Sequence, residues 1–388
     1  QGDTMQIMIT GGGTGGHIFP AIAIANALMT KGMEADILFI GAKGRMEMEK
    51  VPAAGYRIEG LPISGFQRRL TWKNLTFPFK LIGSMLKAWS IITKFKPEVV
   101  IGVGGYASGP TLRIAVSKGI PSLILEQNSF PGLTNRLLGN KVQKVCVAYE
   151  GMSKYFPEEK IVLTGNPIRQ EVVKIQGKKE EALKHFGLVP GKKTLLVIGG
   201  SLGSGTINQA MLKFVKESLD DHNIQLLWQT GKYYFDVIKA NFPNPEFQIR
   251  NLVILPFIDR MDLAYSSADL IVSRAGAIAI SELCVVDKPV ILVPSPNVSE
   301  DHQTKNARAL ADKNAAVMVA DNIAIETLGK TIVDLFNNQP LQSELRTNIR
   351  ALGICNAADA IAEVALSLIA AKDVGRGTKD EGRGTWDV

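Results

Sequence analysis

Residues 7–20 of the chain read IMITGGGTGGHIFP, an apolar run followed by six small residues, a histidine and, further on, a proline. The apolar run predicts a buried strand, and Pro20 indicates the first turns of a helix. Glycine lets a backbone approach a ligand closely, and the N–H groups at a helix N-terminus attract anions. The stretch therefore predicts a strand, an anion-binding loop and a helix, the opening of a doubly wound α/β domain.

A second stretch repeats this order at residues 195–208, which read LLVIGGSLGSGTIN. Between and beyond the two stretches, near-continuous apolar runs alternate with helical periodicity, as is typical of parallel sheets covered on both faces. Two Rossmann-like domains fit 388 residues better than one very large sheet. We expect domains at 1–166 and 167–356, a helix near 357–371 that packs back on the first domain, and a disordered tail at 373–388.

The composition is that of an ordinary soluble globular protein, with 46% hydrophobic and 21% charged residues, which excludes disordered, collagen-like and disulfide-stapled classes. The net charge of +7 predicts a basic surface that faces a phosphorylated ligand, an acidic membrane or a nucleic acid. The three cysteines lie far apart without a C-x-x-C pair, which favours a reducing compartment. No apolar run reaches the ~18 residues of a spanning helix. We therefore expect a cytosolic protein.

The first glycine-rich loop also satisfies G-x-G-x-x-G, the dinucleotide fingerprint. That fingerprint requires an acidic residue at the end of the second strand, and residues 39–43 read FIGAK. An NADP-linked oxidoreductase is therefore a weaker alternative. His17 follows the loop at a helix N-terminus, beside backbone donors, so a catalytic or ligand contact is favoured over a structural role.

Three further residues each admit two interpretations. Glu126 ends a buried strand, where open α/β sheets bind ligands, but a structural role, as an N-cap or in an ion pair with Arg136, is equally consistent. Arg169 follows a turn, and its guanidinium can either form bidentate hydrogen bonds with a diphosphate or simply lie on the surface. Glu282 lies early in a helix, where it can accept hydrogen bonds from ribose hydroxyls or serve only the helix dipole. His302 has no second histidine at i+4 and the chain has no Asp-x-Asp, so we expect no metal site and no cofactor.

Residues 60–97 contain no acidic residue, seven lysines and arginines, and six Phe or Trp side chains. A basic and bulky apolar segment too short to span a bilayer predicts a helical surface that lies on an anionic membrane. Nucleic-acid binding, or an amphipathic helix with a solvated lysine face, gives the same composition. The candidate membrane residues are Arg68, Arg69, Trp72, Lys73, Phe77, Phe79 and Lys80.

Seven short motifs together resemble the MurG family of bacterial transferases, from about Met5 to Ala371. In order they are GTGGH (13–17), GGY (104–106), EQN (126–128), TGNP (164–167), GGS (199–201), SRAGA (273–277) and HQ-x-x-NA (302–307). The resemblance implies a GT-B fold, two Rossmann-like doubly wound domains that face an inter-domain cleft. It also implies transfer of N-acetylglucosamine from UDP-N-acetylglucosamine to lipid I (undecaprenyl-diphospho-muramoyl-pentapeptide), with inversion, giving lipid II and UDP.

The same resemblance implies residue roles. His17 and Glu126 are the two candidate general bases, and Tyr106 lines the acceptor side. The implied donor-binding residues are Thr14, Gly15, Gly16, Asn128, Arg169, Ser201, Ile258, Ala277, Ile278, Ala279, Ile280, Ser281, Glu282 and Gln303. Ala279 departs from the family, because many members carry threonine there.

The implied place of action is the cytoplasmic face of the inner membrane, where the enzyme is a peripheral protein on an anionic surface. We expect no nucleic-acid partner. The competing classes are another GT-B enzyme such as a UDP-sugar epimerase, the NADP-linked oxidoreductase, and a basic nucleic-acid binder, which would show steeply salt-dependent affinity.

Overall fold

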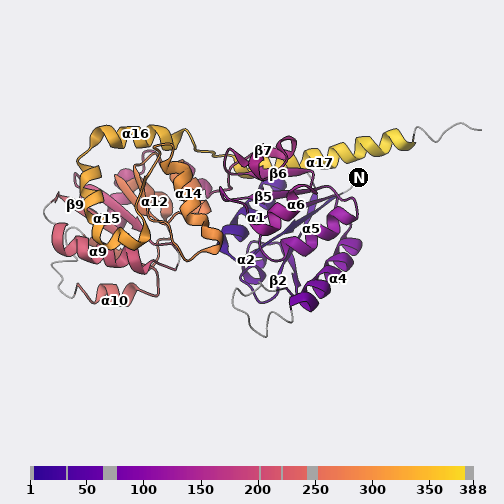
Figure 1. The fold of residues 1–388 in the computed structure, drawn as a ribbon, viewed down its shortest axis with the longest axis horizontal. Helices are drawn as coiled ribbons and strands as arrows, with labels where there is room; N and C mark the ends of the chain where they lie inside the picture. Colours follow the sequence, from indigo (N-terminus) through magenta and orange to yellow (C-terminus); the bar gives the residue numbers. More distant parts are fainter. Residues whose placement is uncertain are drawn as a thin grey trace, which may run out of the picture. The chain divides into compact units, whose positions relative to one another are not determined.

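The computed structural model describes residues 4–31, 34–63, 77–200, 202–219, 222–242 and 252–380. The chain divides into two compact units, one of Gln1–Pro167 with Asn356–Val388 and one of Ile168–Cys355 (Figure 1). This division falls one residue after the boundary that the sequence suggests.

The first unit is built on a seven-stranded sheet in the order β3-β2-β1-β4-β5-β6-β7, and every pair is parallel. Crossovers on both sides of β1 make it the topological switch point of a doubly wound sheet. The edge strand β3 escapes the sequence pattern, because its first residues are partly solvent-exposed and include a charged side chain. The strands are β1 (Met5–Thr10), β2 (Ala35–Ala42), β3 (Arg57–Leu61), β4 (Val99–Gly102), β5 (Ser122–Glu126), β6 (Lys144–Val147) and β7 (Ile161–Leu163).

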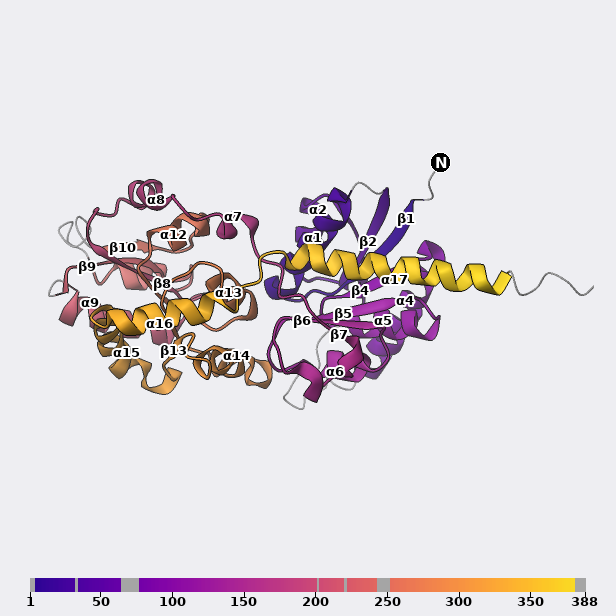
Figure 2. The same cartoon turned by 90° about the horizontal axis from the view of Figure 1, so that it is seen from above.

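Helices cover both faces of this sheet. They are α1 (Gly15–Thr30), α2 (Glu47–Ala53), α4 (Phe77–Phe95), α5 (Ser108–Ser117), α6 (Leu133–Gly139) and α17 (Ala357–Asp380), with short 3₁₀ turns η1 (Met152–Lys154) and η2 (Glu158–Lys160). Although it ends the chain, α17 runs beside α1, and Ile361 and Ala365 join the core that includes Ile18 and Ile24 (Figure 2). Residues 373–380, expected in a disordered tail, are helical instead, because extending an existing helix is far easier than starting one.

The second unit repeats the plan with six parallel strands in the order β10-β9-β8-β11-β12-β13. Its strands are β8 (Lys193–Ile198), β9 (Ile224–Gln229), β10 (Leu252–Leu255), β11 (Leu270–Ser273), β12 (Val290–Leu292) and β13 (Val317–Met318). Its helices are α7 (Gln170–Val173), α8 (Lys179–Phe186), α9 (Gly205–Ser218), α10 (Phe235–Lys239), α12 (Met261–Ser267), α13 (Ala277–Leu283), α14 (His302–Ala311), α15 (Asp321–Phe336) and α16 (Gln339–Arg350), with the 3₁₀ turn η4 (Ser299–Asp301).

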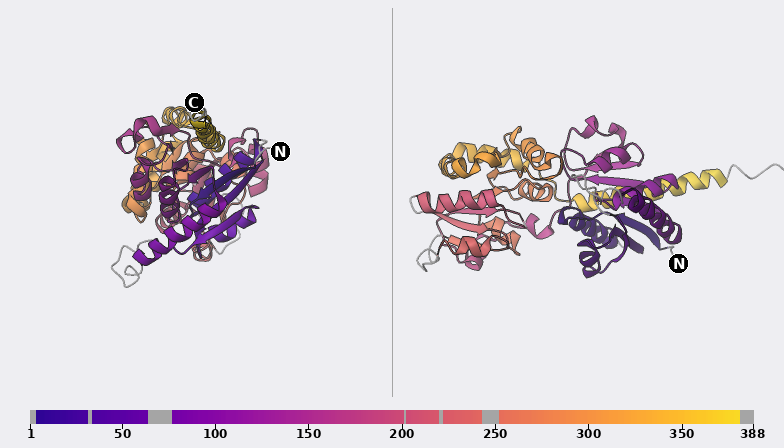
Figure 3. Two further views of the ribbon diagram at one scale, coloured as in Figure 1. Left: turned by 90° about the vertical axis from the view of Figure 1, so that its right-hand side faces the viewer. Right: turned by 60° about the horizontal axis from the view of Figure 1, so that its bottom comes forward.

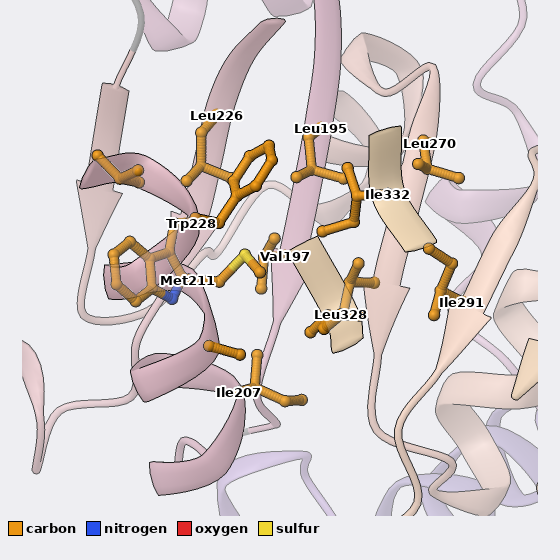
Figure 4. Packing of buried hydrophobic residues seen from close by; sticks show 14 of the residues in the cluster. Leu195, Val197, Ile207, Met211, Leu226, Trp228, Leu270, Ile291, Leu328 and Ile332 are labelled. Atoms are coloured by element: carbon orange, nitrogen blue, oxygen red, sulfur yellow. The ribbon is translucent and has the colours of Figure 1, made fainter. Parts of the chain in front are cut away.

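The core of the second unit forms between its sheet and helices α9 and α15. Val197 and Trp228 of the sheet lie against Met211 of α9 and Leu328 of α15, and all four are buried (Figure 4). The indole N–H of Trp228 donates to Asn208 Oδ1 at 3.0 Å, so its one polar atom is satisfied. In each unit this packing fixes a switch point, between β1 and β4 and between β8 and β11, and ligands of such sheets bind at the carboxyl ends of those strands.

Candidate functional site

The loops that follow β1 and β4 touch each other at the switch point of the first unit. The Gly12 N–H donates to the Gly104 carbonyl oxygen at 3.2 Å. A Cβ on Gly105, whose φ is +90°, would lie 2.1 Å from the Gly12 carbonyl oxygen. Only glycine fits this crossing of two backbones, so the two glycine-rich motifs build one surface.

Glu47, which the sequence did not single out, lies beneath the first glycine-rich loop. Its buried carboxylate accepts hydrogen bonds from the N–H groups of Gly13 and Ala42, each at 2.9 Å. A Cβ on Gly12 would lie 2.3 Å from Glu47 Oε1, so the loop rests directly on this carboxylate. Along the sequence Glu47 resembles a surface residue at the start of a charged helix, and only the tertiary structure distinguishes it.

His17 lies near two other residues that the sequence selected. Its Nδ1 is 3.1 Å from Thr14 Oγ1, within hydrogen-bond distance. A Cβ on Gly104 would lie 2.8 Å from Nε2 of the ring, so Gly104 leaves the room that the imidazole fills. The half-exposed Tyr106 ring lies beside Gly13, 4.0 Å from where a Cβ on that glycine would be, which is an ordinary contact distance. Thr14, His17 and Tyr106 therefore gather around one loop.

Glu126 is buried, and its carboxylate accepts several hydrogen bonds from neighbouring residues. It accepts from the backbone N–H groups of Asn128 (3.0 Å) and Gly132 (3.1 Å) and from the side-chain amides of Asn128 (3.3 Å) and Asn135 (2.8 Å). Burial raises the pKa of Glu126, and these four hydrogen bonds oppose the rise without cancelling it. These four hydrogen bonds hold the loop after β5. None of the four comes from Arg136, the ion-pair partner that the sequence also allowed.

The loops at the switch point of the second unit are also joined closely. A Cβ on Gly203 would lie 2.2 Å from the Thr230 carbonyl oxygen, at φ +81°. The Gln229 side chain donates to the Gly200 carbonyl oxygen and accepts from the Ile258 N–H, both at 3.0 Å. Ile258 is buried, so its candidate contact is through the backbone; Ser201 lies outside the described residues.

Gln303 connects the loops after β11 and β12. Its side-chain oxygen accepts from the N–H groups of Ala275 (3.2 Å) and Ser295 (2.9 Å). Its amide nitrogen donates to no group in the part of the chain that the structure describes, so it has hydrogen-bonding capacity for a ligand.

The candidate residues of α13 do not share one environment. Gly276 precedes the helix without a side-chain cap, and Ala277, Ile278 and Ala279 form the first turn. Ile280 is buried in the core, and the Ser281 hydroxyl donates to the Ala277 carbonyl oxygen at 3.0 Å. Any ligand contact from Ile280 would come from its backbone rather than its side chain.

Arg169 and Glu282, which the sequence assigned to different parts of a donor, form a bidentate ion pair. Arg169 Nε donates to Glu282 Oε1 at 2.7 Å and Nη2 to Oε2 at 2.6 Å, and the Tyr265 hydroxyl adds a bond to Oε2 at 3.1 Å. The Glu282 side chain is 2% exposed and that of Arg169 is 43% exposed. Burial lowers the pKa of Arg169, but the hydrogen bonds and charge of Glu282 outweigh it and leave the pKa raised.

The same carboxylate affects its neighbour in the core. Burial, followed by the charge of Glu282, raises the pKa of Tyr265 well above its ordinary value, so this hydroxyl stays protonated and donates.

No group of three or more His, Cys, Asp and Glu side chains is placed to hold a metal ion within the described ranges. In those same ranges, no helix is long and apolar enough to cross a membrane.

Comparison with known families matches both units. Residues 7–147 match the glycosyltransferase family 28 N-terminal domain, and residues 194–363 match its C-terminal domain. The UDP-N-acetylglucosamine–N-acetylmuramyl-(pentapeptide) pyrophosphoryl-undecaprenol N-acetylglucosamine transferase of Bacteroides fragilis is 50% identical over 95% of this chain and 97% of its own. The transferase of the same name from Parabacteroides distasonis is 51% identical over 94% of this chain and 98% of its own.

Solved structures agree with these matches. Acinetobacter baumannii MurG superposes with a TM-score of 0.76 at 29% identity, over 94% of this chain and 99% of that chain. UDP-GlcNAc 2-epimerase from Neisseria meningitidis gives 0.64 at 14% identity, over 94% and 100%, which shows a shared fold alone. The predicted GT-B fold of two Rossmann-like domains is confirmed. The chain belongs to glycosyltransferase family 28, and within it to the MurG family of N-acetylglucosamine transferases.

Proposed function

We propose that this protein transfers N-acetylglucosamine from UDP-N-acetylglucosamine to lipid I, which yields lipid II and UDP in peptidoglycan synthesis. The observation that carries the proposal is the identity of about half of all residues, over nearly the whole chain, with curated transferases named for this reaction. The glycine-rich surfaces at both switch points, with their candidate residues around them, support it.

The second unit is proposed to hold the donor. The departing UDP gains negative charge as the sugar leaves, so a guanidinium that can fork onto a diphosphate stabilises the transition state. Arg169 supplies that group, and Glu282 supplies a buried carboxylate for the ribose hydroxyls. Arg169 and Glu282 hydrogen-bond to each other. The bound donor is proposed to replace these bonds, with the ribose hydroxyls on Glu282 and the diphosphate on Arg169.

The first unit is proposed to supply the general base. The acceptor hydroxyl must lose its proton as the new bond forms. Glu126 is buried with both oxygens accepting hydrogen bonds, which favours a loop-positioning role. His17 lies at the glycine-rich surface with Thr14 beside its Nδ1, an arrangement that orients an imidazole. We assign the base to His17 on this contrast.

The test of this assignment is steady-state kinetics with a short-chain, water-soluble lipid I analogue. Replacing a general base typically lowers turnover ~10²–10⁴-fold, so His17→Ala should lose that much kcat while KM for the donor stays unchanged. His185→Ala is the matched control, because His185 is exposed on α8 of the other unit. A fall of about tenfold or less for His17→Ala, with a much larger fall for Glu126→Gln, would move the base to Glu126.

We also propose that α4 attaches the protein to an anionic membrane. Phe79, Ile82, Leu86 and Trp89 are 78%, 57%, 65% and 51% exposed, and their spacing puts them on one face of the helix. The opposite face, which includes Ala88, is buried against the sheet. Figure 3 shows α4, in purple, at the surface of the first unit. An exposed apolar stripe of this kind is typical of a helix that lies in a bilayer interface.

Cations flank part of this stripe. The ammonium of Lys118, the residue after α5, lies 4.8 Å from the centre of the Trp89 ring, and Lys80 is exposed near the start of α4. Lys87, by contrast, donates to the Gly60 carbonyl oxygen at 2.8 Å and pairs with Glu59, so it faces the sheet. Phe77 is the first residue of α4, and the other candidates, Arg68, Arg69, Trp72 and Lys73, lie outside the described residues.

Co-sedimentation with vesicles tests the membrane proposal. The protein should bind phosphatidylglycerol vesicles more than phosphatidylcholine vesicles, and salt should weaken binding. Ile82→Ser with Leu86→Ser should reduce binding and activity on membrane-embedded acceptor, with activity on the soluble analogue retained. Val237→Ser, at an exposed apolar residue of the second unit, is the control. Equal losses on both acceptors would contradict a membrane role.

A further inference from the structure

The second unit contains a cavity that the proposed reaction does not use. Its volume is about 440 Å³, and it lies at the amino ends of three neighbouring strands. Lys193 begins β8, Asp269 precedes β11 and Lys288 lies two residues before β12. Because all three strands are parallel, this edge is opposite to the one that carries the glycine-rich loop and Arg274. The cavity is therefore separate from the candidate donor site.

Positive charge dominates the cavity wall. Four lysines and one arginine line it, against one carboxylate; they are Lys179, Lys192, Lys193, Lys288, Arg346 and Asp269. The carboxylate of Asp269 is already engaged, since it accepts from the Thr194 N–H at 2.9 Å and pairs with Lys179 at 2.6 Å. A concave wall with this excess of one sign concentrates anions.

Lys288 is the residue that the fold leaves uncompensated. It is partly buried, and no carboxylate among the described residues lies within ion-pair distance of its ammonium. The nearby Asp287 pairs instead with Arg346, through a bond of 2.9 Å. Burial lowers the pKa of Lys288, and the charges of Lys179 and Arg346 lower it further against the pull of Asp269 and Asp287. A desolvated ammonium without a counter-ion is unfavourable unless an anion reaches it.

Lys193 and the start of α16 add to the positive potential of the cavity. The Lys193 ammonium donates to the Phe336 carbonyl oxygen at 3.1 Å and lies over that ring, 5.6 Å from its centre. The Gln342 amide donates to the same carbonyl at 3.2 Å, which ties the end of α15 to α16. Gln339, the first residue of the twelve-residue helix α16, also lines the cavity, so the positive end of a helix dipole lies at this wall.

We infer that this cavity binds a small phosphate-bearing anion, a phosphate monoester or a diphosphate, independently of the donor site. The charge excess and the unpaired Lys288 define the phosphate end of the ligand. Known small-molecule pockets span roughly 300–1,000 Å³, so 440 Å³ accommodates an organic group as well as the phosphate.

Equilibrium dialysis of labelled inorganic pyrophosphate against the full-length protein, with and without saturating UDP, tests the inference. A component of binding should persist in UDP. Lys288→Gln and Arg346→Gln should each weaken that component by about tenfold or more, because each removes a charged hydrogen-bond donor. Lys239→Gln on α10, which follows the carboxyl end of β9, removes the same charge elsewhere and should change it less than about twofold.

Thermal unfolding gives a second readout that does not depend on the radiolabel. Without an anion, Lys288→Gln should be at least as stable as the parent, because it removes a partly buried charge that has no ion-pair partner among the described residues. Pyrophosphate should raise the Tm of the parent and of Lys239→Gln, and raise that of Lys288→Gln much less. Glycerol 3-phosphate and phosphatidylglycerol vesicles, each offered as a competitor, distinguish a free phosphate ester from a lipid headgroup. Pyrophosphate binding that Lys288→Gln and Arg346→Gln leave unchanged, or the absence of saturable binding, would overturn the inference.

Discussion

Arg169→Ala should destabilise the second unit, and adding Glu282→Gln to it should restore much of the loss. Glu282 is 2% exposed and depends on Arg169 for two of its three hydrogen bonds. Removing the arginine leaves a buried carboxylate whose remaining hydrogen bond, among the residues that the structure describes, comes from the Tyr265 hydroxyl. Glutamine in place of Glu282 removes that charge and keeps an acceptor for Tyr265, so the second substitution should compensate for the first.

The magnitude follows from the burial of the pair. Breaking a buried ion pair by removing one partner costs ~3–5 kcal/mol. Because the Arg169 side chain is 43% exposed and water can partly replace it, we expect about 3 kcal/mol, the lower end of that range. For a unit of this size, that corresponds to a fall in Tm of roughly 6–12 °C. The double variant should recover more than half of this fall.

Thermal unfolding of the full chain, followed by circular dichroism near neutral pH, provides the measurement. The transition that moves to higher temperature on adding UDP belongs to the donor-binding unit, since a ligand stabilises the state that binds it. A double variant that is less stable than Arg169→Ala, or an Arg169→Ala protein as stable as the parent, would refute this account of the pair.

Three further predictions concern single carboxylates and thiols. Glu47→Gln should lower the free energy of unfolding, measured by urea titration, by ~1–3 kcal/mol and should also reduce kcat, because the new amide NH₂ faces one of the two backbone N–H donors. An unchanged free energy and kcat would show that the glycine-rich loop does not rest on Glu47. Burial raises the pKa of Glu126 above its unfolded value of about 4.5. Ionisation of this carboxyl therefore destabilises the folded state, and between about pH 4 and 7 the Tm of the parent should fall relative to the Tm of Glu126→Gln. A difference in Tm that stays constant over this pH range would contradict the raised pKa. Burial raises the pKa of Cys146 and Cys284 to about 12, whereas Cys355 is exposed, so Ellman's reagent should titrate one thiol in native protein and three in denaturant.

Much of the fold could be predicted from the periodicity of the apolar residues and from the glycines and prolines at the ends of the elements. Apolar runs bounded by glycine locate the central strands of both sheets, because parallel strands buried on both faces must be apolar throughout. β3 lacks this apolar pattern, because its first residues are partly exposed and include the charged side chains of Arg57 and Glu59. The extent of α17 was also underestimated, since its last residues have no periodicity.

Candidate site residues could be selected from the sequence, but their partners could not. The strand–glycine–helix order places Thr14 and His17 at the switch point, and the structure brings Tyr106 to the same loop from a distant motif. The pairing of Arg169 with Glu282 spans more than a hundred residues, and no local pattern indicates it. Glu47 gave no signal, because the need for its carboxylate arises only when the loop lies over it.

The most direct test of the transferase proposal is to identify the product formed from UDP-N-acetylglucosamine with and without a soluble lipid I analogue. We predict that UDP is released only when the acceptor is present, that the acceptor gains the mass of one N-acetylhexosamine, and that proton NMR shows an inverted anomeric centre in the new linkage. Formation of an epimerised UDP-sugar without the acceptor, or an acceptor of unchanged mass, would contradict the proposed function.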